Sequence, residues 1–191
     1  DCSIELLDGL QNILPAGTPR IAQTNSSNLV DAYKWTELDA RTGLASYSLY
    51  SGISDRAEPS ESLRANTVFC LGLAVQKTLL SVTQLRDFRA GKNLHQENQR
   101  RGIRGAYLVN ASLELAAQDS QHWQIVADLE KTQAQVIELQ QQLRDPIIVA
   151  AAIDDSVELD ERVPATDDAE TPVERIAEDE DDPDRPKRSG W

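Results

Sequence analysis

The feature that most constrains the fold is a regular spacing of apolar residues between positions 106 and 144. Eleven positions from 108 to 143 alternate steps of three and four residues, and eight of the eleven hold apolar side chains. A repeat of 3.5 residues keeps one stripe of a helix facing its partner over several turns. The spacing therefore predicts a long helix with a coiled-coil-like packing seam, formed by Leu108, Leu115, Ile125, Leu129, Val136, Leu139 and Leu143.

The most hydrophobic stretch of the chain, residues 61–90, predicts the partner of that helix. Six apolar residues from Val68 to Leu85 fall on one helical face, and Gly91 follows as a stop signal. Residues 67–85 carry Lys77 as their only charge, so membrane insertion is an alternative. Their many Gln, Thr and Ser side chains make the stretch too polar for that, and no membrane span is expected.

The first 60 residues give weaker signals. Residues 4–14 show near-helical apolar spacing that ends at Pro15, and residues 28–43 also allow a helix. Residues 44–53 alternate apolar and polar side chains, which suits a strand as well as a helix. Because a lone strand would have no partner, a helix or an extended loop is favoured there.

Together these patterns predict a mainly α fold: a long-helix hairpin or small helical bundle. We expect an N-terminal arm of short helices and loops over 1–60 and a helical hairpin core over 61–145. Residues 146–153 form an apolar run that would dock on the helices or on another subunit. Residues 154–191 form an acidic tail.

The charge of the chain is concentrated in that tail. The net charge is −13, and residues 154–191 hold 15 acidic and 5 basic residues, which leaves only −3 for residues 1–153. The tail contains four prolines and few large apolar residues, so it cannot bury enough surface to offset its ordering entropy. We therefore expect it to be disordered in isolation.

Residues 86–104 form a basic segment in this acidic chain. Its six cations outnumber two acids and are candidates for anion binding: Arg86, Arg89, Lys92, Arg100, Arg101 and Arg104. Nucleic acid is one candidate ligand. The near-neutral charge of residues 1–153 as a whole and the acidic tail argue against it, and favour the pairing of the acidic tail with a basic patch on a neighbouring copy or on a partner.

The two cysteines give a clue to the cellular compartment, because a disulfide suits an oxidising environment. Cys2 and Cys70 could form a disulfide, although an unpaired buried Cys70 fits the sequence equally well. The chain begins at Asp1 and contains no Met, as expected of a processed product. These features favour an extracytoplasmic location or a processed assembly.

No motif indicates catalysis, a metal or a cofactor. His95 lies in the basic segment and His122 in the predicted seam, where a histidine usually sets helix register. The cysteines and histidines lack the spacing of zinc ligands, and there is no glycine-rich phosphate loop or HExxH motif. An enzyme that uses His95 or His122 in a pocket remains a third hypothesis.

The most distinctive features all concern association. They predict a non-catalytic structural or adaptor subunit that forms a homo-oligomer or hetero-oligomer with other protein subunits. Long Gln-rich helices of this kind occur in many assemblies, including secretion systems and virions. The alternative is a nucleic-acid-associated protein that uses residues 86–104.

Overall fold

The computed structural model describes residues 2–50 and 64–145, and these residues form a β-sandwich. Three antiparallel strands make the small sheet, in the order β1 (Cys2–Ile13), β7 (Gly105–Leu115), β5 (Lys77–Leu79). Five antiparallel strands make the large sheet, in the order β6 (Gln99–Arg101), β2 (Lys34–Asp39), β3 (Leu44–Leu49), β4 (Arg64–Leu71), β8 (Gln124–Thr132). The prediction of a mainly α bundle is therefore wrong.

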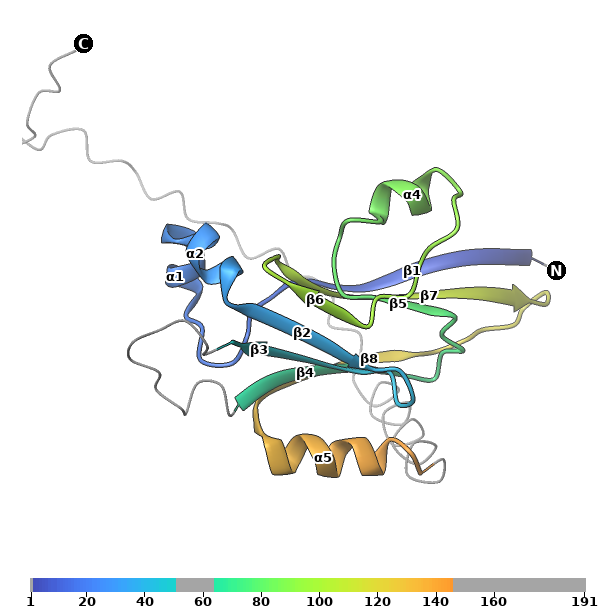
Figure 1. Ribbon diagram of the computed structural model, residues 1–191. Helices are drawn as coiled ribbons and strands as arrows, with labels where there is room; N and C mark the ends of the chain where they lie inside the picture. The colour runs from blue at the N-terminus through green and yellow to red at the C-terminus, as the bar shows by residue number, and fades with distance from the viewer. Residues whose placement is uncertain (1, 51–63, 146–191) are drawn as a thin grey trace, which may run out of the picture.

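In the described residues, four short helices lie around the sheets. Helices α1 (Arg20–Asn25) and α2 (Ser27–Ala32) connect β1 to β2. Helix α4 (Leu85–Arg89) lies over the outer face of the small sheet, and α5 (Gln133–Gln142) lies under the outer face of the large sheet (Figure 1). Each of these two helices covers an apolar cluster on the outer face of its sheet, which accounts for strands such as β4 and β7 that carry apolar residues on consecutive positions.

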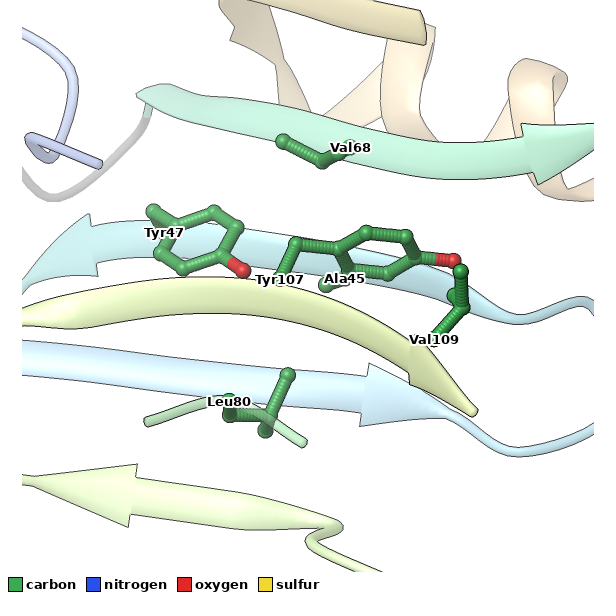
Figure 2. Close-up of a cluster of buried hydrophobic side chains, with 6 residues drawn as sticks. All are labelled: Ala45, Tyr47, Val68, Leu80, Tyr107 and Val109. Atoms are coloured by element: carbon green, nitrogen blue, oxygen red, sulfur yellow. The ribbon is translucent and has the colours of Figure 1, made fainter. Parts of the chain in front are cut away.

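The main core lies between the two sheets. The large sheet contributes Ala45, Tyr47 and Val68, and they meet Leu80, Tyr107 and Val109 from the small sheet and the residue that follows β5 (Figure 2). All six side chains are at most 1% exposed. Alternate residues of β3 and β7 point into this layer, as strand geometry requires.

Helix α5 covers a second cluster on the outer face of the large sheet. Leu44, Phe69 and Leu71 pack there against Val136, Leu139 and Leu143. Thr132 is the N-cap of the helix: its hydroxyl accepts a hydrogen bond from the Gln135 N–H while the Gln135 side chain accepts one from the Thr132 N–H. This capping box satisfies two backbone donors and fixes the point where strand turns into helix.

The predicted long helix over 106–144 is replaced by two strands and the short helix α5. Leu108 and Leu115 lie in β7, Ile125 and Leu129 lie in β8, and only Val136, Leu139 and Leu143 belong to α5 or its C-cap. The seam and the coiled coil are therefore wrong. Strand β7 is apolar on consecutive positions because its two faces pack against different clusters, and such a run also satisfies a spacing of three and four.

The predicted helix over 61–90 is also wrong. Strand β4 places Val68 in the core between the sheets and Phe69 under α5, so neighbouring residues are both buried. Strand β5 and the five-residue helix α4 follow. Gly91, predicted as a helix stop, does lie just after α4, where its φ is +67° and its N–H bonds to the Phe88 carbonyl.

The predictions for the first 60 residues fail because the sequence does not show which strands pair with one another. Residues 4–14, predicted as a helix, belong mainly to β1, which pairs with β7 from Cys2 opposite Leu115 onward. Residues 44–49, whose alternation suited a strand, form β3 between β2 and β4. Within 28–43 a short helix, α2, is followed by β2. Both sheets thus combine strands from before and after residue 60.

The predictions for the apolar run 146–153 and the acidic tail 154–191 fall outside the described residues. Within residues 2–50 and 64–145, no helix is long and apolar enough to cross a membrane.

Candidate binding cleft beneath helix α4

A cleft of about 900 Å³ opens on the outer face of the small sheet, beside α4. Its floor is formed by one residue from each strand of that sheet: Glu5 of β1, Asn110 of β7 and Lys77 of β5. Lys77 lies directly opposite Asn110 in the ladder, and the Asn110 side chain donates a hydrogen bond to the Glu5 carboxylate at 2.6 Å. Three polar side chains are therefore held side by side on a rigid sheet.

The wall of the cleft comes from α4 and the turn that follows it. It is lined by Phe88, Arg89 and residues 91–95. Phe88, Leu85 and Leu94 pack against Leu79 and Leu108 of the sheet, so the wall is anchored by an apolar cluster. The Lys92 N–H bonds to the Asp87 carbonyl at 2.9 Å, which closes the turn after the helix.

A buried carboxylate fixes both ends of this wall segment. Glu97 is only 3% exposed and accepts hydrogen bonds from the Leu80 N–H, Ser81, Gln84 and Arg100, with the Arg100 contact at 2.6 Å. Burial alone would raise the pKa of Glu97, but these donors outweigh it and hold that pKa below its ordinary value. Glu97 therefore remains ionised and ties residues 80–84 to the β6 strand.

The charge of the cleft is positive. Lys77, Arg89 and Lys92 are exposed around it, and Glu5 is the single carboxylate among the lining residues. The Lys92 ammonium also contacts Asp87 at 2.9 Å, an exposed pair that solvent weakens. Amide groups of Gln76, Asn93 and Asn110 add neutral donors and acceptors. Such a lining suits a ligand that carries several carboxylates along a chain with its own amide groups.

The structure distributes the six predicted anion-binding cations over separate places. Arg89 and Lys92 line the cleft, and Arg86 is exposed on the same helix outside the lining. Arg100 pairs with Glu97, and the Arg101 guanidinium lies 3.4 Å from the centre of the Trp35 ring. These two guanidinium groups serve mainly to hold the edge of the large sheet.

Arg104 lines a smaller cleft of about 420 Å³ together with Arg20 and Lys34. The Lys34 side chain is buried, and its ammonium is bonded to Asp31 at 2.8 Å and to Gln23. Arg104 itself lies 3.9 Å from Asp31. The buried Lys34 cation is thus neutralised by Asp31, which leaves Arg20 and Arg104 as the exposed cations of this second cleft.

The remaining sequence candidates are not brought together. Cys2 and Cys70 are both free thiols, so the structure lacks the disulfide that the sequence allowed. Burial raises the pKa of Cys70 to about 11. His95 lines the wall of the cleft, whereas His122 is exposed just before β8 and not in a helix seam. In the part of the chain that the structure describes, no group of His, Cys, Asp and Glu could hold a metal ion.

Sequence reasoning missed the floor of the cleft. Glu5 and Asn110 are 105 residues apart, and no local pattern connects them. The available signal was the alternation within each strand, which places Leu7 and Glu5 on one face, but it becomes informative only once the pairing of β1 with β7 is known.

No family model matches this chain, and no curated protein matches it. The function is therefore inferred from the cleft.

Proposed function

We propose that this chain is a non-catalytic structural or adaptor subunit that binds an acidic segment of a partner protein in the cleft beside α4. The observation that carries the proposal is the arrangement of Lys77, Arg89 and Lys92 around a floor built on three paired strands. Rigid elements position binding groups more accurately than free loops do.

The size and polarity of the cleft favour a peptide over a compact small molecule. Its volume of about 900 Å³ lies at the upper end of the range for small-molecule pockets, and its cationic lining is exposed. The amide side chains of Asn93 and Asn110 can bond to peptide backbone, while the cations bond to Asp and Glu side chains.

The expected affinity is modest and sensitive to salt. Exposed ion pairs each contribute about 0.2 to 1 kcal/mol, so three cations supply specificity and a fast association rate more than tight binding. Screening within about 10 Å at 0.1 M salt weakens these contacts further. An adaptor that uses this cleft would need additional contacts elsewhere in its assembly.

Isothermal titration calorimetry tests the proposal. The titrant is a synthetic peptide of alternating Glu and Ser, and the reference titrant replaces every Glu with Gln. We expect binding of the acidic peptide alone, with an affinity that falls as salt rises. Replacement of Arg89 by Glu should weaken this binding by about tenfold or more, because it removes one attractive charge at the cleft wall and adds a repulsive one.

Arg86→Glu is the matched control. Arg86 lies on the same helix, is also exposed, and does not line the cleft, so the same change of net charge should reduce binding only a few fold. Equal loss in the two variants, or equal affinity for the acidic and the neutral peptide, would contradict the proposed site.

A single-stranded nucleic acid is the second candidate. It is favoured by the ring of Tyr50, which is 52% exposed and stacks on Trp35 near Arg101, since bases stack on exposed aromatic rings. The same calorimetric titration with an oligothymidine, repeated at several salt concentrations, tests this candidate. Absence of salt-dependent binding removes it.

A further inference from the structure

We infer that the cleft beside α4 also takes an acidic segment of its own chain, residues 167–182, which competes with the partner. This inference rests on the proposed function, because it assigns a second, intramolecular ligand to the same site. The proposed ligand is the acidic segment of the same molecule. Binding of the acidic segment of a second molecule would be a different result, which the cross-linking experiment below distinguishes.

Charge complementarity supports this choice of ligand. Residues 167–182 hold nine acidic residues and one basic residue, a net charge of −8. The cleft presents Lys77, Arg89 and Lys92 against the single carboxylate of Glu5. Five consecutive acids at 178–182 can meet cations that lie on both the floor and the wall.

The length of the intervening chain permits the contact. Helix α5 and helix α4 lie on opposite sides of the sandwich, so the chain must pass around both sheets (Figure 1). Sheets and helices pack in layers roughly 10 Å apart, which makes this path several tens of ångströms long. Twenty-one residues separate Asp145 from residue 167, and they span up to about 70 Å when extended.

A tethered ligand has a large advantage over a free one. A segment attached by a short chain reaches an effective concentration on the order of 1 mM. If the segment binds with a dissociation constant of about 0.1 mM, it occupies the cleft most of the time and weakens an external acidic ligand about tenfold. A partner would therefore displace the segment only if it binds more tightly or is present at a higher concentration.

Zero-length cross-linking of the full chain detects the contact directly. A carbodiimide joins a lysine amine to a carboxylate that touches it, and peptide mapping identifies both residues. We expect Lys77 and Lys92 to couple to acids within 167–182 in the monomer fraction, and these products to disappear in about 0.5 M NaCl. Lys131, on β8 away from the cleft, is the control lysine and should not couple to that segment.

Two results would overturn the inference. One is the absence of couplings between Lys77 or Lys92 and residues 167–182. The other is their presence only in covalent dimers, which would assign the contact to a second copy.

Calorimetry separates this inference from the proposed function. In a full-length variant, the nine acids of 167–182 are replaced by Asn and Gln, and the acidic Glu/Ser peptide is titrated as before. We expect this variant to bind the peptide about tenfold more tightly than the natural chain. Equal binding by both proteins overturns the inference and leaves the proposed function intact, whereas no binding by either contradicts the proposed function.

Discussion

The hydroxyl of Tyr47, in the large sheet, donates a hydrogen bond to the carbonyl of Ala106, in the small sheet, at 2.7 Å. Tyr107 makes the reverse connection, from the small sheet to the Gly43 carbonyl beside the large one, at 2.8 Å. Both tyrosines are 1% exposed. These two bonds fix the lateral position of one sheet on the other.

Tyr47→Phe should therefore destabilise the fold by about 1 to 2 kcal/mol, since it leaves a buried carbonyl without this donor. Urea unfolding measures the change in the free energy of unfolding. Tyr50→Phe is the control, because Tyr50 is 52% exposed and keeps its aromatic stack without the hydroxyl. If the two variants were equally stable, the cross-sheet bond would have no net effect.

The stability of the fold should decrease in alkaline solution. Burial raises the pKa of Tyr47 and of Tyr107 above the ordinary value of 10.0. The neutral hydroxyl is thus favoured in the folded state, and the unfolded chain loses its protons first as the pH rises above 10. Urea unfolding at pH 8 and pH 11 should show a lower free energy of unfolding at pH 11, and a smaller loss in Tyr47→Phe.

The stability of the fold should also decrease in acid, because of the Glu97 carboxylate. Its pKa in the fold is lowered from 4.5, so its contribution to stability is present above about pH 4.5 and is lost as the pH falls through the folded value. Glu97→Gln removes the charge that meets the partly exposed Arg100 and should cost about 1.5 to 3 kcal/mol at neutral pH. Between pH 3 and pH 7, the free energy of unfolding should change less with pH in the variant than in the natural chain.

The surface pair Lys92 and Asp87 provides the comparison for Glu97. Its atoms are 2.9 Å apart but both side chains are well exposed, so Asp87→Asn should change stability by less than about 1 kcal/mol. A similar effect of the two substitutions would show that Glu97 does not anchor the wall of the cleft.

Gly9 should not tolerate a side chain. A Cβ atom at this position would lie 1.9 Å from the Tyr107 carbonyl oxygen on the neighbouring strand, and the φ of Gly9 is +153°. Gly9→Ala should therefore destabilise the fold by at least about 2 kcal/mol. Gly17→Ala, where φ is +74° but no atom lies within 4 Å, should cost only about 1 kcal/mol. Thermal unfolding of both variants distinguishes the contact from the backbone conformation.

The two thiols should differ in reactivity. Cys2 is exposed, whereas Cys70 lies against the core between the sheets and burial raises its pKa to about 11. Thiolate is the reactive form, so a disulfide reagent at pH 8 should label Cys2 rapidly and the half-buried Cys70 much more slowly. Cys2→Ser isolates the Cys70 reaction, and rapid labelling of that variant would contradict the packing of β4.

The sequence contained local signals for individual strands and helices, but it did not show which strands pair with one another. The alternation at 44–53 suited a strand as well as a helix, and the helix or extended loop favoured there was wrong, since Leu44–Leu49 is β3. The Thr132 to Gln135 spacing marks the start of α5. The larger error came from burial on both faces. A strand such as β7 then shows consecutive apolar residues, and periodicity alone cannot distinguish it from part of a buried helix.

The candidate site was predictable only in part for the same reason. Arg89 and Lys92 stood out because basic residues are dense between 86 and 104. Glu5, Lys77 and Asn110 belong to three strands that meet through pairing across long stretches of sequence. The ion pair between Glu97 and Arg100 could not be predicted either. A spacing of three residues brings charges together in many structures and does not indicate whether they are buried.

The pairing of β1 with β7 has a consequence for how the chain folds during synthesis. Strands β2, β3 and β4 are close in sequence and can associate once about residue 71 is available, but Cys2 has to wait for Leu115. Pairings across more than a hundred residues fold slowly because a long loop must close before any contact forms. Strand β1, which is synthesised well before its partner β7, is therefore among the last of the described strands to pair, and until then the nascent chain carries an unpaired edge that a chaperone could recognise.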